Sequence, residues 1–278
     1  MQQAHGEVVR LSERVQRIVA PNPGPMTGHG TNTYLIGSEA MAALDPSPAS
    51  DSHIEAILDA VGDRLRWIVC THTHPDHSPA AAVLAERTGA KLVGRTTEDD
   101  QHQDLTFQPD WLVEHDEVVA SEGWHLRAIW TPGHVDNHVC YLLEEEGMVF
   151  AGDHIMNGST VVIIPPGGNM KHYIESLQKL LDYPVASIAP GHGELIPDCC
   201  AEVEKLVRHR LMREAKVVAG LERTGPVPID ALVPVVYNDV DPSLYPWAKL
   251  SLLAHLLKLE VESRASVNDE VWRLTQSD

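Results

Sequence analysis

The segment THTHPDHS places four potential metal ligands within six residues: His72, His74, Asp76 and His77. Imidazole nitrogens and carboxylate oxygens are ligand atoms that zinc and similar divalent metals prefer in proteins. Pro75 excludes an ordinary helix interior, so a loop can bring these side chains into one small volume. A histidine-rich surface loop is the alternative, and four ligands so close together make it the weaker one. The segment therefore predicts a metal site.

Three more potential ligands occur later in the chain, each beside glycine and just after an apolar run. His134 lies in TPGHVDNH, Asp153 in MVFAGDH and His192 in IAPGHGE. Glycine lets the backbone approach an ion closely. Loops that follow strands are where α/β proteins commonly gather functional side chains. We therefore expect these three residues to join the first four at one edge of a sheet.

The ordered motifs HxHxDH, PGH, GD and PGHG resemble those of the metallo-β-lactamase superfamily, with a metal motif of the glyoxalase II type. The segments NPGPMTGHGTNTYLIG and LLAHLLKLE resemble its lactamase-beta-2-like branch. The motifs are highly specific for the superfamily, less so for the branch and weak for the substrate. The resemblance covers nearly the whole chain. It implies an α/β fold, the metallo-β-lactamase αββα sandwich, with a small C-terminal winged-helix-like domain.

The resemblance also implies a binuclear site for two divalent metal ions, Zn²⁺ first, with Mn²⁺ or Fe²⁺ as alternatives. The implied ligands form two sets and one shared carboxylate: His72, His74 and His134 for one ion, Asp76, His77 and His192 for the other, and Asp153 as the bridge. A hydroxide held between the ions would attack an electrophilic carbonyl or phosphorus. Asp76 is also a catalytic candidate, because its carboxylate can orient the attacking water or relay its proton.

Other residues near the motifs carry weaker predictions. His138 lies four residues after His134 and either donates to a substrate oxyanion, as a catalytic residue, or supports a ligand through a hydrogen bond. His154 is expected to support the geometry of the site. Three residues in or beside loops are candidates to line the substrate pocket, with a surface or core position as the equal alternative: His29, Asn32 and Tyr173.

These motifs need a layered scaffold, and apolar strand-like runs indeed alternate with helix candidates up to residue 198. One helix is expected after Ser78 as its N-cap, with Gly89 ending it. Beyond residue 198 we expect helices at 208–221, 229–237 and 247–259, then two short strands around an Asn-Asp turn. The predicted domains are a catalytic domain, 1–200, and a winged-helix-like domain, 201–278.

Composition indicates a soluble, cytoplasmic protein with a sizeable core. Hydrophobic residues make up 43% of the 278 residues, and the N-terminus shows no signal-like apolar run. The four cysteines form no disulfide framework. The formal net charge is −19; residues 201–278 hold 10 Lys and Arg against 12 Asp and Glu, which leaves −17 on the rest. Such a surface repels nucleic acid phosphate.

The predicted function is hydrolysis of a small acyl substrate, a thioester or lactone, with no membrane partner and with a homodimer as one option. A single-strand-specific endoribonuclease, as in the lactamase-beta-2-like branch, is the alternative, disfavoured by charge. A β-lactamase or a nucleic-acid-binding module with a vestigial site is less expected. The motifs of His134 and His192 are 58 residues apart, which leaves no room for a large inserted cap domain. This disfavours the RNA-processing and DNA-repair branch of the superfamily, which carries such a domain. Redox di-iron chemistry would need a flavin domain, for which 278 residues leave no room, so it is disfavoured.

Overall fold

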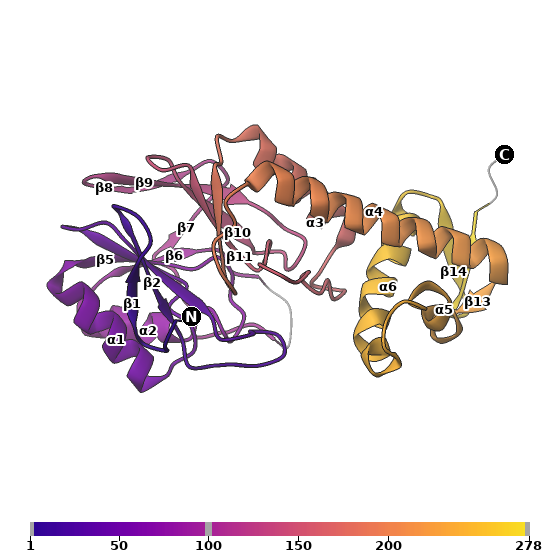
Figure 1. Cartoon of the computed structure of the whole chain (residues 1–278), viewed down its shortest axis with the longest axis horizontal. Helices are drawn as coiled ribbons and strands as arrows, with labels where there is room; N and C mark the ends of the chain where they lie inside the picture. Colours follow the sequence, from indigo (N-terminus) through magenta and orange to yellow (C-terminus); the bar gives the residue numbers. More distant parts are fainter. Residues whose placement is uncertain (1–2, 98–101, 276–278) are drawn as a thin grey trace. The chain divides into compact units, whose positions relative to one another are not determined.

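Two β-sheets form the centre of the N-terminal part of the chain in the computed structural model (Figure 1), which describes residues 3–97 and 102–275. The first sheet contains, in spatial order, β1 (Val8–Arg10), β2 (Val15–Val19), β3 (Asn32–Ile36), β4 (Met41–Leu44), β5 (Leu65–Val69), β6 (Lys91–Gly94) and β7 (Trp111–Leu112). The second contains β12 (Ser187–Pro190), β11 (Met148–Gly152), β10 (Val139–Leu143), β9 (Trp124–Trp130) and β8 (Val118–Ser121). Neighbours from β1 to β4 are antiparallel and those from β4 to β7 are parallel.

The inner strands of the first sheet, β2 to β6, are mostly buried on both faces, since successive side chains of a strand point to opposite sides. In β5, Val69 faces the core between the two sheets. Its neighbour Ile68 faces a second core under α1 (Asp51–Val61) and α2 (Ala80–Thr88). Burial on both faces explains why β5, the strand before His72 and His74, ends in the apolar run WIV.

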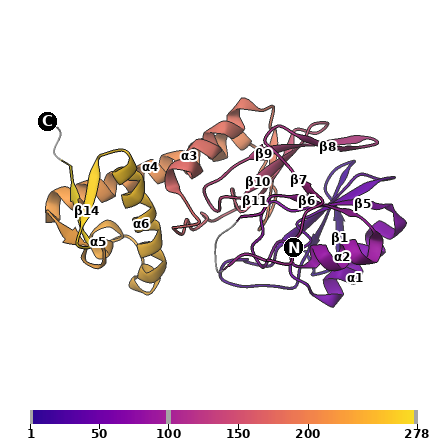
Figure 2. The same cartoon turned by 180° about the vertical axis from the view of Figure 1, so that it is seen from behind.

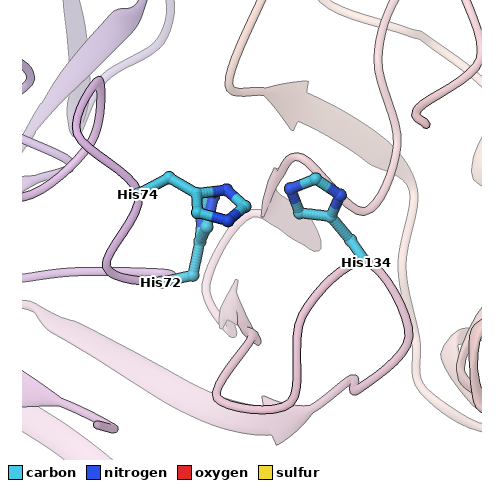
Figure 3. A group of neighbouring side chains, drawn as sticks. All are labelled: His72, His74 and His134. Carbon is cyan, nitrogen blue, oxygen red and sulfur yellow. The ribbon is translucent and has the colours of Figure 1, made fainter. Parts of the chain in front are cut away.

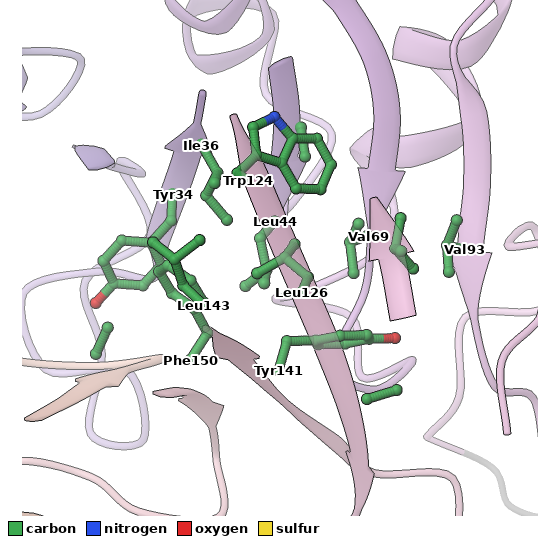
Figure 4. Close-up of a cluster of buried hydrophobic side chains, with 14 of the residues drawn as sticks. Tyr34, Ile36, Leu44, Val69, Val93, Trp124, Leu126, Tyr141, Leu143 and Phe150 are labelled. Carbon is green, nitrogen blue, oxygen red and sulfur yellow. The ribbon is translucent and has the colours of Figure 1, made fainter. Parts of the chain in front are cut away.

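Large aromatic side chains fill the space between the sheets, as Figure 4 shows. Tyr34 and Phe150, from different sheets, have ring centroids 5.0 Å apart. Trp124 is fully buried, and its indole N–H donates to the carbonyl of Ala40 at 2.7 Å. The packed sheets form the rigid support from which the ligand loops extend.

The part of the chain that the structure describes divides into two compact units. The first comprises residues 1–131, 137–161 and 180–200, and the second residues 132–136, 162–179 and 201–278. The second unit contains α3 (Met170–Lys179), most of α4 (Cys199–Thr224), β13 (Val227–Pro228), α5 (Ile229–Val236), α6 (Tyr245–Val261), β14 (Ala265–Asn268) and β15 (Val271–Leu274). Short 3₁₀ helices occupy Gly62–Arg64, Leu180–Asp182 and Pro242–Leu244. The predicted domain boundary at residue 200 stays a prediction.

The three C-terminal strands form a separate sheet in the order β13-β15-β14. Figure 2, from behind, shows α5, α6 and β14 around the C-terminal part of α4. The three helices and the hairpin of β14 and β15 are the expected winged-helix arrangement, and β13 is an additional strand that was not predicted. No helix in the described ranges is both long enough and apolar enough to cross a membrane.

Three local expectations were wrong in detail. Helix α2 begins at Ala80 after Pro79, and no side chain caps it, because the Ser78 hydroxyl donates to Asp104 at 2.7 Å. Helix α4 begins at Cys199, earlier than expected, and runs 26 residues. The turn between β14 and β15 consists of Asp269 and Glu270, both with positive φ, and so lies one residue later than expected.

Candidate metal centre

Three histidines form the first ligand group. His72 and His74 lie on the loop that directly follows β5, and His134 on the loop that follows β9. One ring nitrogen from each lies within 4.8 Å of the others, and Figure 3 shows the three rings turned toward one another. His72 Nε2 and His74 Nδ1 are 2.9 Å apart. The side chains predicted for one ion therefore do come together.

The second ligand group contains Asp76, His77, Asp153 and His192, again within 4.8 Å of one another. Nε2 of His77 and Nε2 of His192 each lie 3.2–3.4 Å from carboxylate oxygens of Asp76 and Asp153. Ligand atoms at roughly 2.1 Å from a tetrahedral ion are separated by about 3.4 Å. The spacing of this group therefore fits a divalent cation.

Two buried nitrogens support that fit. His77 Nε2 and His192 Nε2 make no hydrogen bond of acceptable geometry to any residue that the structure describes. Buried polar atoms without a hydrogen bond are rare in native proteins and need an explanation such as an ion. The ring centroids of His72 and His77 are 4.2 Å apart, so the two ligand groups adjoin. The arrangement is consistent with a binuclear site; metal identity and the bridging role of Asp153 stay predictions.

The electrostatics of the second group depend on protons when no cation is bound. Burial acts to lower the pKa of His192, but the Asp153 carboxylate outweighs it and raises that pKa to about 9. Burial acts to raise the pKa of Asp153, yet the charges of His192 and His77 hold it well below its usual range. The pKa of Asp76 is lowered as well, so the carboxylates of both Asp76 and Asp153 are ionised and can accept a cation. A bound cation would displace the imidazole protons.

Asp45, at the end of β4, was missed as a site residue. It is 1% exposed, and its carboxylate accepts hydrogen bonds from Thr71 N at 2.7 Å and Thr71 Oγ1 at 2.8 Å. It also accepts from His77 Nδ1 at 3.0 Å, which leaves His77 Nε2 for a metal. The available signal was a carboxylate directly after an apolar strand, MAALD, the same context as Asp153.

Thr71 extends this support to the first group. Its hydroxyl donates to Asp45, so it accepts the proton of His72 Nδ1, which lies 3.0 Å away. His72 is thereby held with Nε2 toward the metal position. One buried carboxylate thus orients one histidine of each ligand group.

Gly152 of the GD motif has a steric reason to be glycine. Its φ is +46°, and a Cβ there would collide with the Thr71 hydroxyl and lie 2.8 Å from His138 Nε2. Larger residues would push apart the loop that carries Asp153 and the loop that carries His72.

In the second unit, the His134 loop lies against the start of α3. His134 Nδ1 is 3.2 Å from the carbonyl of Val162, so this nitrogen donates and Nε2 faces the metal position. Gly133 accepts from the backbone N–H of Asn169 at 2.8 Å, and a Cβ on Gly133 would collide with the backbone of Tyr173. Helix α3 therefore positions this ligand.

His138 lies behind the first ligand group. It is fully buried, and its Nδ1 is 2.9 Å from the hydroxyl of Thr131. Its ring centroid is 5.1 Å from that of His72 and 5.8 Å from that of His154, which is also buried. Of the two roles weighed for His138, this position favours support of a ligand over donation to a substrate.

The three candidate pocket residues have defined structural partners. Asn32 is 2% exposed and donates to the carbonyls of Pro190 and Gly193, so it holds both ends of the His192 loop. His29 lies 2.7 Å from the Gln3 carbonyl through Nε2, and its ring stacks on that of His5. Tyr173 on α3 is fully buried. A contact of any of them with substrate stays a prediction.

Comparison with known proteins agrees with this site. A sequence model for the metallo-beta-lactamase superfamily matches residues 26–192, and one for the beta-lactamase associated winged helix domain matches residues 229–272. The beta-lactamase-like protein 2 homolog of Drosophila melanogaster is 32% identical over 278 aligned residues, covering 94% of this chain and 92% of its own. An atrochrysone carboxyl ACP thioesterase of Aspergillus fumigatus is 30% identical, covering 78% of this chain and 67% of its own.

Among solved structures, a beta-lactamase domain protein from Burkholderia ambifaria superposes with a TM-score of 0.81 at 18% identity, covering 99% of this chain and 95% of that one. This likeness concerns the fold. The chain belongs to the metallo-β-lactamase superfamily and is a metallo-hydrolase with the αββα sandwich and a C-terminal winged-helix domain. Within the superfamily it is similar to the beta-lactamase-like protein 2 homologs.

Proposed function

We propose that this hydrolase cleaves a small acyl substrate, a thioester or a lactone, and that RNA is not its substrate. The main support is that most basic residues on α4 and α6 of the second unit are buried or paired with carboxylates, so few are accessible to bind RNA phosphates. The thioesterase among its relatives adds a precedent for acyl chemistry. The first 200 residues carry a net charge of −17, which disfavours a polyanion.

The RNA alternative needs a basic cluster on α4, made of Arg208, Arg210 and Arg213, to be accessible to a single strand. Arg210 is only 4% exposed, and its guanidinium lies 5.1 Å from the centroid of the Tyr173 ring. Arg213 pairs with Asp239 at 2.9 Å. Of the three arginines in the cluster, only Arg208 is exposed. A single strand needs several accessible cationic contacts along its path, and this helix does not supply them.

Helix α6 occupies the position of the reading helix in a winged helix, but its surface is unsuited to a nucleic acid groove. A reading helix presents polar and basic side chains to base edges. Its only two lysines are instead paired with carboxylates, Lys249 with Asp230, and Lys258 with Glu214 and Glu262; it has no arginine. This supports a packing role for the winged helix.

Bound divalent cations would supply a Lewis acid and a water of lowered pKa. The candidate ligand residues would hold those cations, and within the second group Asp76 is the one most open to solvent. The Asp76 side chain is 27% exposed, whereas those of His77 and His192 are 0% and 6% exposed. In the second group Asp76 is therefore the side chain that a substrate arriving from solvent could reach most readily, and its carboxylate could orient the attacking water and accept its proton.

One panel assay tests the proposal. Metal-loaded protein is incubated with an acyl thioester, a lactone, a β-lactam and single-stranded RNA, each at low and high salt. We expect turnover of the thioester or the lactone that chelator abolishes and salt changes little. RNA cleavage that falls steeply with salt and disappears in the Arg208→Ala, Arg210→Ala, Arg213→Ala triple variant, with no acyl turnover, would establish the endoribonuclease instead.

A further inference from the structure

A buried polar chain runs from α1 to the back of the metal centre. It begins at His53 on α1, passes through Thr33 on β3 and ends at the loop of Asp45 and Ser47. All four residues are at most 1% exposed. Buried polar groups are usually hydrogen-bonded. Among the side-chain polar atoms of these four residues, only His53 Nδ1 has no hydrogen-bond partner in the described part of the structure.

The loop of Asp45 and Ser47, where this series of hydrogen bonds ends, has an unusual backbone. Asp45 has φ +49° and Ser47 has φ +70°, although neither is glycine. Non-glycine residues avoid this left-handed region, and they persist there only when their surroundings hold them. The surroundings must therefore provide specific contacts to this loop.

Thr33 provides the central contact. Its hydroxyl lies 2.7 Å from the carbonyl of Asp45, 3.1 Å from Ser47 Oγ and 2.8 Å from His53 Nε2. A carbonyl only accepts, so the single hydroxyl proton of Thr33 goes to Asp45. The hydroxyl must then accept a proton from His53, which fixes His53 as the tautomer with hydrogen on Nε2.

The other face of the loop touches the metal centre. The backbone N–H of Ser47 donates to the carbonyl of His77 at 2.9 Å. The carboxylate of Asp45 accepts from His77 and from Thr71, which in turn accepts from His72. A shift of Asp45 would therefore misdirect one histidine in each ligand group.

We propose that His53 and Thr33 are positioning residues of the metal centre: they hold Asp45 in the left-handed conformation that aims its carboxylate at His77 and Thr71. Neither residue touches a ligand, and both lie outside the ligand motifs. The proposal rests on the metal centre and not on which substrate is cleaved. Loss of outer hydrogen-bond partners commonly weakens metal binding roughly 10–100-fold.

The test uses paired variants. Thr33→Val removes the hydroxyl at nearly constant volume, and Thr33→Ser restores it. His53→Leu removes the donor, and His53→Gln offers an amide N–H in its place. Trp124→Phe is the control: it breaks a partly buried hydrogen bond to Ala40, at the opposite end of β4 from Asp45.

Three quantities are measured on full-length protein: cobalt(II) affinity by chelator competition, the visible spectrum of the cobalt(II) form, and urea unfolding of the metal-free form. We expect Thr33→Val and His53→Leu to weaken cobalt binding about tenfold or more and to shift the spectrum. Thr33→Ser and His53→Gln should recover most of the affinity. Trp124→Phe should lower stability but leave affinity and spectrum at the wild-type values.

A purely structural role predicts a different result. If Thr33→Val and His53→Leu lose stability like the control but keep wild-type cobalt affinity and spectrum, the proposal is wrong. If Thr33→Val does not fold, His53→Leu decides by the same two readouts, because it leaves the Thr33 hydroxyl in place.

Discussion

Asp153 and His138 differ in what their side chains give the metal centre. Asp153 contributes a charged ligand atom to the second group, whereas His138 is buried behind His72. We expect Asp153→Asn to lower metal content and to reduce turnover far more than His138→Ala. An oxyanion donor would be worth roughly 10²–10³ in rate. A loss of turnover of that size in His138→Ala would show that His138 is a catalytic residue after all. Elemental analysis and turnover of both variants measure the difference.

Asp45 is the second prediction at this scale. Asp45→Asn removes a charge and turns one of the two acceptor oxygens into an amide NH₂. That NH₂ would face Thr71 Oγ1 and His77 Nδ1 if it replaced Oδ2, or the donor Thr71 N if it replaced Oδ1. We expect metal affinity to fall roughly 10–100-fold. The exposed Asp63→Asn makes the same charge change without these contacts and should bind metal normally. Equal affinity of the two variants in chelator competition would contradict the role assigned to Asp45.

At the scale of elements, α6 carries a buried histidine whose protonation opposes folding. Burial, followed by the charges of Arg210 and Lys258, lowers the pKa of His255 to about 3, against 6.5 when unfolded. The unfolded chain therefore binds more protons between these values, so stability is lost as pH falls from about 7. At pH 5 the loss is about 2 kcal/mol.

His255→Leu should remove that part of the pH dependence. We expect the free energy of unfolding of the variant, relative to that of the wild type, to rise by about 2 kcal/mol as pH decreases from 8 to 5, each measured by urea unfolding without metal. Comparison at each pH cancels the protons bound by the ligand groups, which both proteins share. A constant difference in free energy of unfolding over this range would show that His255 does not contribute.

For the whole molecule, two adjoining ligand groups predict two metal ions per chain. Protein purified without chelator should contain close to two equivalents of Zn, Mn or Fe by elemental analysis, because seven ligands exceed the four that one ion commonly takes. A value that stays at one or below after metal supplementation would disprove the binuclear site.

Truncation after residue 200 separates the two groups. The second ligand group lies wholly within the first unit, whereas the His134 loop and α3 belong to the second unit with most of α4 and all of α6. The shortened chain should retain about one metal equivalent, lose solubility as Tyr173 and its neighbours become exposed, and bind the other ion weakly. Retention of two tightly bound ions would show that α3 positions His134 without those helices.

The sequence by itself determined the candidate ligand set that the structure brings together, the strands before each ligand loop and most helices, because these features are local. THTHPDHS carries its chemistry in consecutive residues, and glycines beside His134, Asp153 and His192 mark close approaches of backbone. The winged helix was equally visible in the helical spacing of residues 247–259. The ordered motifs then identified the superfamily, and with it the fold.

Only the tertiary structure decided which residues support the ligands. Asp45 reaches Thr71 and His77 across 26 and 32 positions of sequence, and Asn32 reaches Gly193 across 161. Contacts over such separations depend on which strands become neighbours, and they leave no periodic or local pattern. The same is true of the burial of Arg210, which no local pattern predicts. Its burial against Tyr173 arises from packing between α3 and α4, which spacing along either helix does not reveal.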